Sequence, residues 1–310
     1  MEAWYSDEVT KNGKKKVVFK KEQASPAWVM KPLRLPCGRC KGCRLEYSRQ
    51  WAIRCYHEAS LHKDNAFITV TYRDEDLPKN EECKKCKVEQ CAARGTVEQG
   101  QSLCKRDFQL FMKRLRKRLE GKEVKIKYYM CGEYGSQKGR PHYHACIFGY
   151  DFPDRELWKV DKRTGVPLFT SEELEKVWQK GYCTVGDVTF QSAAYVARYI
   201  MKKITGKGKE EIKEETGLKH YERINANTGE IIFIQDEYTN CSRGGRNGKG
   251  IANNWYKDFK DDVFPSDFLV IDGKKMKPPK YYDKLFEIDE PEMFEEIKKR
   301  SEERRVGKEC

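Results

Sequence analysis

The run His142-Tyr143-His144-Ala145-Cys146-Ile147 places two imidazoles on alternate residues of a short, mostly apolar segment. Such a run favours a β-strand, and side chains repeat with period two along a strand, so both rings point to one side. Two imidazoles on one face are suitable ligands for a divalent metal. The alternative is a polar strand face with two solvated histidines. Only five histidines occur in 310 residues, which favours a metal site over coincidence.

The residues before this run predict a hairpin. Residues 124–134 and 141–150 form two predicted strands, and the loop 135–140 is short enough for an antiparallel turn. Folding the chain about the centre of this loop puts Glu133 opposite His142, within reach of a shared ion. The pattern therefore predicts a metal site of Glu133, His142 and His144. A register shift of one residue would turn Glu133 away.

Hydrophobic periodicity predicts further elements around the hairpin. Apolar residues at helical spacing indicate helices over 45–62 and 105–119, and a β-branched, aromatic run indicates a strand over 66–72. A helix over 171–180 with Ser171 as its N-cap, a strand over 182–190 and a helix over 191–204 follow. Residues 1–30 are polar and predict an arm or an edge strand at best. Together these elements predict an α+β fold with a largely antiparallel sheet.

Composition indicates the partners. The formal net charge is +13, and such an excess of lysine and arginine favours a polyanion. The sequence has no run of 18 apolar residues and no signal-like segment, so it predicts a cytosolic protein without a membrane partner. Thirteen cysteines in a cytosolic protein favour thiols and metal ligation over disulfides.

Two tyrosines lie one turn apart in the predicted helix 191–204. Tyr195 and Tyr199 share a face, beside Lys202 and off the apolar stripe. They are placed either as reagents or as ordinary surface tyrosines. The residues that define the apolar stripe are Ala193, Val196, Ala197, Ile200 and Ile204.

The cysteines predict a structural zinc site. Cys37, Cys40 and Cys43 lie within seven residues, and the polar loop 74–103 contains another Cys-x-x-Cys pair. Zinc takes four such ligands, often from two pairs of this kind, whereas the alternative is a set of reduced thiols. The sets that remain open are Cys37 and Cys40 with Cys83 and Cys86, and a local set of Cys83, Cys86, Cys91 and Cys104.

Two basic segments could follow a DNA backbone. The helix 105–119 carries Lys113, Arg116 and Lys117 on its polar face, and residues 242–250 form a glycine-rich basic loop. For the helix, a solvated face is the alternative.

In order and spacing, the strand 67–72, the His142-Tyr143-His144 run and Tyr195-x-x-x-Tyr199 with Lys202 and Lys203 resemble the HUH endonucleases that start rolling-circle replication. More narrowly, the chain resembles the replication initiators of microviruses, especially the gokushovirus branch. The resemblance covers residues 34–285. The motifs that extend it lie at residues 37–44, 48–52, 108–116, 255–256 and 279–282.

The resemblance implies an RRM-like palm, a central antiparallel sheet flanked by helices. It also implies metal-dependent nicking and rejoining of single-stranded DNA at a phage origin through a 5′-phosphotyrosine. Tyr195 and Tyr199 match the nucleophiles, with Lys202 available for proton transfer or phosphate contact. His142, His144 and Glu133 match the ligands of Mg²⁺ or Mn²⁺. Arg198 stands where many relatives carry lysine, and with Lys203 it is expected to contact DNA.

The same resemblance sets the expected organisation. Residues 1–33 form a basic arm, 34–206 the nicking domain with the cysteine knuckle and the cysteine-bearing loop, and 207–299 a basic extension. Residues 300–310 look like a translated sequencing adapter rather than native sequence. The expected partners are origin DNA and a host helicase and polymerase in the host bacterial cytoplasm. Two alternatives remain: a transposase or plasmid initiator with the same chemistry, and a zinc-stabilised, non-enzymatic nucleic-acid-binding protein.

Overall fold

The computed structural model describes most of the chain in two compact units, residues 1–46 and 47–310. Tyr199, Lys202, Cys83, Cys86 and Cys91 lie outside the described residues. The described residues are 2–9, 15–27, 29–30, 32–38, 40–77, 102–135, 139–162, 164–198, 203, 207–214, 216–224, 229–243 and 250–306.

The first unit contains a small antiparallel sheet. Strand β1 (Glu2–Val9) lies between β2 (Lys15–Val18) and β3 (Leu33–Arg34), and a 3-10 helix, η1 (Lys21–Gln23), follows β2. Trp4 and Val18 bury their side chains. The sequence predicted only an arm or an edge strand here, because the few apolar residues show no clear period among many charges.

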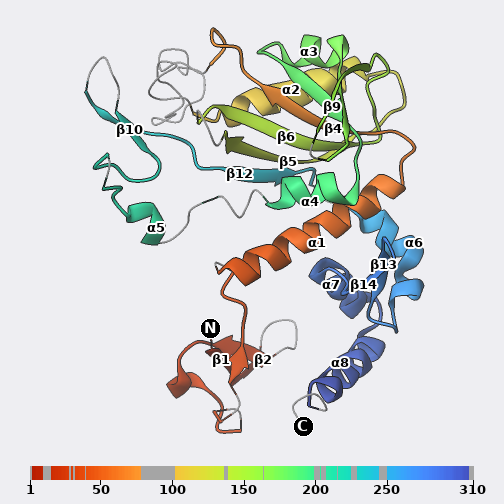
Figure 1. Cartoon of the computed structure of the whole chain (residues 1–310). Helices are drawn as coiled ribbons and strands as arrows, with labels where there is room; N and C mark the ends of the chain where they lie inside the picture. The colour runs from red at the N-terminus through yellow and green to blue at the C-terminus, as the bar shows by residue number, and fades with distance from the viewer. Residues whose placement is uncertain are drawn as a thin grey trace. The chain divides into compact units, whose positions relative to one another are not determined.

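The second unit is built on a seven-stranded antiparallel sheet in the order β12-β5-β6-β4-β9-β8-β7 (Figure 1). Along the central strand β4, every second residue is buried, as the alternating sequence predicted. The antiparallel α+β fold is therefore confirmed. The strands are β4 (Asn65–Thr71), β5 (Lys127–Tyr134), β6 (Pro141–Phe148), β7 (Glu156–Val160), β8 (Pro167–Thr170), β9 (Cys183–Gly186) and β12 (Tyr238–Cys241).

Helices cover both faces of this sheet (Figure 1). On one face, α2 (Lys105–Arg118) and α3 (Glu172–Trp178) bury Phe111, Leu115 and Trp178 in a first apolar cluster. The Ser171 Oγ accepts a hydrogen bond from the Leu174 N–H at 3.0 Å, which confirms the predicted N-cap of α3. On the other face lie α1 (Lys41–Ser60) and α4 (Phe190–Arg198).

The C-terminal residues contribute to the apolar cluster under α4. Tyr256, Tyr282 and Phe286 pack in one cluster with Val196 of α4 and Ile53 of α1. Among the helices that the structure describes, none combines the length and apolar character needed to cross a bilayer. The remaining elements are α5 (Lys207–Glu210), β10 (Glu222–Ile224), β11 (Ile231–Phe233), α6 (Asn253–Val263), β13 (Leu269–Ile271), β14 (Lys274–Met276), α7 (Lys280–Asp289) and α8 (Pro291–Val306).

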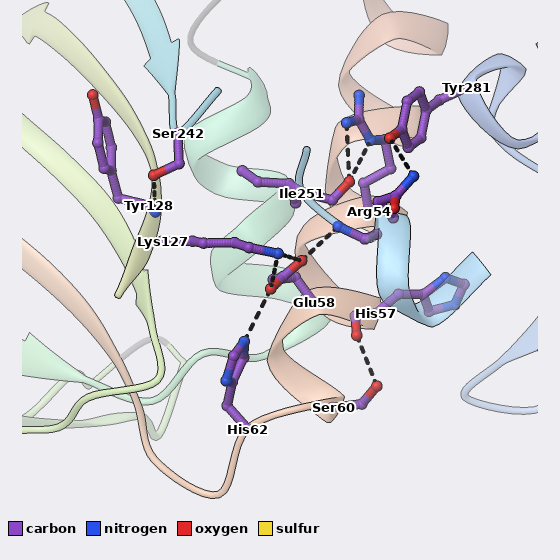
Figure 2. Close-up of polar contacts among 12 residues, drawn as sticks. Arg54, His57, Glu58, Ser60, His62, Lys127, Tyr128, Ser242, Ile251 and Tyr281 are labelled. Carbon is purple, nitrogen blue, oxygen red and sulfur yellow. Dashed lines mark hydrogen bonds and ion pairs between the residues drawn. The ribbon is translucent and has the colours of Figure 1, made fainter. Parts of the chain in front are cut away.

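A buried carboxylate joins α1, the sheet and the turn before α6 (Figure 2). The Glu58 side chain is 1% exposed; its Oε1 lies 2.9 Å from His62 Nε2 and 2.8 Å from Lys127 Nζ. Its Oε2 accepts a 2.6 Å hydrogen bond from the Ala252 N–H. Burial alone would raise the pKa of Glu58, but these three donors outweigh it and the pKa lies below its usual value. The carboxylate is therefore charged and fully paired.

Candidate functional site

The β5–β6 hairpin brings together the three predicted metal ligands. Glu133 pairs with His142 across the two strands, which confirms the predicted register. The Glu133 Oε1 lies 2.6 Å from His142 Nε2 and 3.2 Å from His144 Nε2. All three ligand atoms lie within 4.8 Å of one another. The hairpin therefore presents one carboxylate and two imidazole nitrogens to a common point.

Glu133 and the two histidines are largely withdrawn from water. Glu133 and His144 are buried, and His142 is partly exposed. Burial would raise the pKa of Glu133, but hydrogen bonds from the two imidazoles lower it to about 2. The carboxylate is therefore charged at neutral pH and ready to bind a cation.

The remaining imidazole nitrogens are held from behind. His142 Nδ1 lies 3.1 Å from the Arg140 carbonyl oxygen, and His144 Nδ1 lies 2.8 Å from Thr69 Oγ1. A carbonyl only accepts, so His142 Nδ1 must donate to it. In a neutral His142 the lone pair on Nε2 then faces a carboxylate oxygen at 2.6 Å, an arrangement that needs a proton or a metal cation. This donor set fits a divalent metal.

The tyrosine helix lies beside these ligands. Ala193, Val196 and Ala197 are buried as the apolar stripe predicted, and Tyr195 is 44% exposed. The Tyr195 ring lies edge-on to the His144 ring, with 5.1 Å between centroids and 84° between planes. One candidate nucleophile is therefore adjacent to the candidate metal ligands and accessible to a substrate.

Comparison with known proteins identifies the family. The family model of the replication-associated protein ORF2 matches residues 65–204. Replication-associated protein ORF2 of Spiroplasma virus 4 is 30% identical to this chain over 267 residues, which cover 84% of the chain and 70% of that protein. The chain belongs to the replication-associated proteins of microviruses. This confirms the family that the sequence motifs resembled.

Other replication-associated proteins support the assignment. Protein VP4 of Bdellovibrio phage phiMH2K is 29% identical over 267 residues, which cover 84% of this chain and 70% of that protein. Protein ORF4 of Chlamydia phage 1 is 31% identical over 177 residues, which cover 54% of this chain and 38% of that protein. No solved structure matches. Within the family match, residues 65–204 contain Glu133, both histidines and Tyr195.

The first unit of this replication-associated protein contains a cluster of three thiols. The sulfurs of Cys37, Cys40 and Cys43 lie within 4.8 Å of one another, and Cys37 Sγ lies 3.9 Å from Cys43 Sγ. The Cys40 N–H donates to Cys37 Sγ at 3.2 Å, as in many zinc knuckles. Cys104 is instead buried at the start of α2. The three clustered thiols leave one position of a tetrahedral site for another ligand.

The predicted DNA-binding residues lie in different places. Arg198 is exposed at the end of α4, whereas Lys203 Nζ lies 3.6 Å from Asp236 Oδ2. Lys113, Arg116 and Lys117 are exposed on α2, on the face of the sheet opposite the metal ligands. The structure therefore does not gather the predicted cations around Tyr195.

Sequence reasoning missed two residues of the site, Thr69 and Phe67 of β4. Thr69 pairs with His144 across the strands, and the Phe67 ring stacks on the His144 ring with 5.9 Å between centroids. Both lie on the alternate positions of the predicted strand 66–72 that face away from the first apolar cluster. That alternation was visible, but the pairing of two strands about 75 residues apart was not.

Proposed function

We propose that this replication-associated protein nicks and rejoins single-stranded DNA at a phage origin, through a 5′-phosphotyrosine intermediate of rolling-circle replication. The observation that carries the proposal is the exposed Tyr195 ring against His144, one of three converging metal ligands. The mechanism is that of the HUH endonucleases, which the sequence motifs resemble.

Glu133, His142 and His144 would hold Mg²⁺ or Mn²⁺, because a set of one carboxylate and two imidazoles suits either ion. When bound, such a cation polarises a nonbridging oxygen of the scissile phosphate. Glu133 contributes negative charge, and Thr69 and the Arg140 carbonyl keep the imidazoles oriented.

In the reaction, the Tyr195 oxygen attacks phosphorus and loses its proton. The bond to the 3′-oxygen breaks, leaving a 5′-phosphotyrosine and a 3′-hydroxyl that primes synthesis. Tyr199 would attack the regenerated origin in the second step, with Lys202 as the proton carrier. Arg198 would contact phosphate rather than transfer protons, because a guanidinium stays charged.

The same proposal extends to the rest of the molecule. Residues 34–206 would form the nicking domain, and Cys37, Cys40 and Cys43 with Cys83 or Cys86 would hold a structural zinc. Host helicase and polymerase would supply unwinding and synthesis in the cytoplasm of the host bacterium. A transposase or plasmid initiator would use the same chemistry, but the relatives named above are all proteins of viruses and phages.

A covalent-adduct assay tests the proposal. Labelled single-stranded origin DNA is incubated with the protein and Mn²⁺, and a denaturing gel detects the DNA–protein adduct. We expect Tyr195→Phe combined with Tyr199→Phe to abolish the adduct, because a phenyl ring has no nucleophilic oxygen. Tyr182→Phe is the matched control, because Tyr182 is 68% exposed and outside the ligand set.

Two outcomes would count against the enzyme. Full nicking by the double variant would exclude a tyrosine nucleophile at these positions. Retention of DNA by the wild-type protein without any cleavage would favour the non-enzymatic nucleic-acid-binding protein.

A further inference from the structure

We propose that Arg116 and Arg243 form a second DNA-contact site, which binds a phosphodiester group on the face of the sheet opposite the metal ligands. The choice of DNA as the partner rests on the proposed function. The argument for an anion site rests on the cavity itself.

A cavity of about 250 Å³ lies between α2 and the ends of β5 and β12. Two guanidinium groups line it, and none of its described lining residues carries a carboxylate. Both arginines are exposed, and within the described ranges neither has an ion pair. The cavity is smaller than the ~300–1,000 Å³ typical of small-molecule sites, so it suits a single phosphate group better than a whole cofactor. The lining residues are Arg116, Tyr128, Asn240, Cys241, Ser242 and Arg243.

The backbone fixes the donors of this site. The Ser242 N–H donates to the Tyr128 carbonyl at 2.9 Å, and the Tyr128 N–H donates to Ser242 Oγ at 3.0 Å (Figure 2). Because Ser242 Oγ accepts this bond, its own proton is left to donate to a bound anion. The Arg116 guanidinium lies 5.7 Å from the Tyr128 ring centroid, within cation–π range. Two charged groups and one hydroxyl therefore line a small cavity with a fixed floor.

The site is remote from the metal ligands. Tyr128 packs on the α2 side of the sheet, whereas Glu133 lies on the other side, at about 17 Å along β5 at ~3.4 Å per residue. A DNA strand must pass around the β12 edge to reach both places. The site is therefore suited to DNA that flanks the nick rather than to the scissile phosphate.

A neighbouring cavity continues the basic surface. It measures about 500 Å³, shares Arg116 with the first cavity, and is also lined by Lys113, Lys117 and Lys125. Glu120 and Glu123 lie at its rim and offset part of this charge. The predicted cations of α2 thus lead away from the Arg116–Arg243 site along one path, as a backbone-binding surface requires.

The salt dependence of DNA binding tests the site. A fluorescent oligonucleotide that extends well beyond the nick position is titrated by anisotropy at several salt concentrations, without divalent metal. For single strands, each phosphate contact contributes about 0.7 to the slope of log K against log salt. We expect Arg116→Gln combined with Arg243→Gln to reduce this slope by about 1.4 and to weaken binding several-fold. The loss should be smaller for a short oligonucleotide confined to the nick position.

Arg118→Gln is the matched control. Arg118 lies on the same helix and is also exposed, but its Nε lies 2.7 Å from Glu173 Oε1. Its removal should leave the slope unchanged. The double change to lysine should restore most of the slope, because it keeps the charge.

An unchanged slope and affinity in the double glutamine variant would overturn the proposal. Loss of inorganic phosphate binding with no effect on DNA would also overturn it, because the cavity would then be a site for free anions. The measurement involves no cleavage, so it is independent of the nicking proposal. A reduced slope in a protein that never cuts DNA would leave the Arg116–Arg243 site intact and remove only the nicking mechanism.

Discussion

At the scale of single residues, side chains behind the metal ligands determine how those ligands point. The His144 ring is held by Thr69 through Nδ1 and by Phe67 through ring stacking. A ligand whose second nitrogen is engaged keeps one orientation, so less entropy is lost when an ion binds. Thr69 is therefore a positioning residue for the candidate metal site.

Replacing Thr69 by valine should weaken Mn²⁺ binding by ~10-fold or more, because valine keeps the shape but loses the hydrogen bond to His144. Isothermal titration with Mn²⁺ measures the affinity. Thr184→Val is the control, since Thr184 pairs with Thr69 on the neighbouring strand β9. Equal affinities in the wild-type and Thr69→Val proteins would show that Thr69 does not position His144.

A second residue-scale prediction concerns pH. His57 is buried against Trp255, with 3.5 Å between ring centroids, and burial lowers its pKa to about 3. Between pH 6.5 and 4.5 the unfolded chain therefore binds a proton here that the folded chain does not. The free energy of unfolding should fall as pH falls through this window, by up to about 1.4 kcal/mol per pH unit from this residue.

Urea unfolding of wild type and His57→Phe at several pH values measures this contribution. Burial raises the pKa of Asp283 to about 7, and that carboxyl stabilises the folded state in the opposite direction over the same window. The difference between the two proteins therefore isolates His57. A difference that does not change with pH would contradict the prediction.

At the scale of elements, Glu58 connects three segments that are distant in the sequence. It pairs with Lys127 of β5 and binds the Ala252 N–H before α6, while Arg54 Nη2 on the same helix donates to the Ile251 carbonyl at 3.0 Å (Figure 2). These contacts place α1 between the sheet and the C-terminal residues. The tyrosine helix α4 packs in the same apolar cluster.

Glu58→Gln should lower the free energy of unfolding by about 3 kcal/mol, because it leaves a largely buried Lys127 charge without its counter-ion. Urea denaturation measures the loss. Glu172→Gln is the control: its ion pair with Lys176 is exposed on α3, and such a pair contributes at most ~1 kcal/mol. Equal losses in the two variants would show that burial does not strengthen the Glu58 contacts.

How far the sequence predicts these elements depends on the range of the contacts. The hairpin register, the Ser171 cap and the apolar stripe of α4 depend on neighbouring residues, and all three are confirmed. The edge strand β7 was missed, because its five residues are exposed and show no alternating burial. The Thr69–His144 contact and the Arg116–Arg243 cavity join distant segments, whose pairing no local pattern encodes.

At the scale of the whole molecule, the chain combines two kinds of candidate metal site. Three thiols cluster in the unit of residues 1–46, and a carboxylate with two imidazoles lies on the sheet of the second unit. Thiolates select zinc, whereas the carboxylate–imidazole set suits Mg²⁺ or Mn²⁺. The two sites should therefore load with different ions.

We expect one tightly bound zinc per chain, removed by Cys40→Ser without loss of Mn²⁺ binding at Glu133, His142 and His144. Atomic absorption of the purified protein measures the zinc content. Cys183→Ala is the control, because Cys183 is buried in β9 outside the thiol cluster. A folded wild-type protein free of zinc would exclude a structural zinc site.

The shared apolar cluster also constrains the order of events during synthesis. The side chains of α4 pack with residues from Ile251 to Phe286, which leave the ribosome long after α4 itself. At ~5–20 residues per second, this delay lasts several seconds. A nascent chain therefore carries its tyrosines before their support is complete. Nicking activity should accordingly be a property of the finished protein, so a partly translated initiator would not cut DNA.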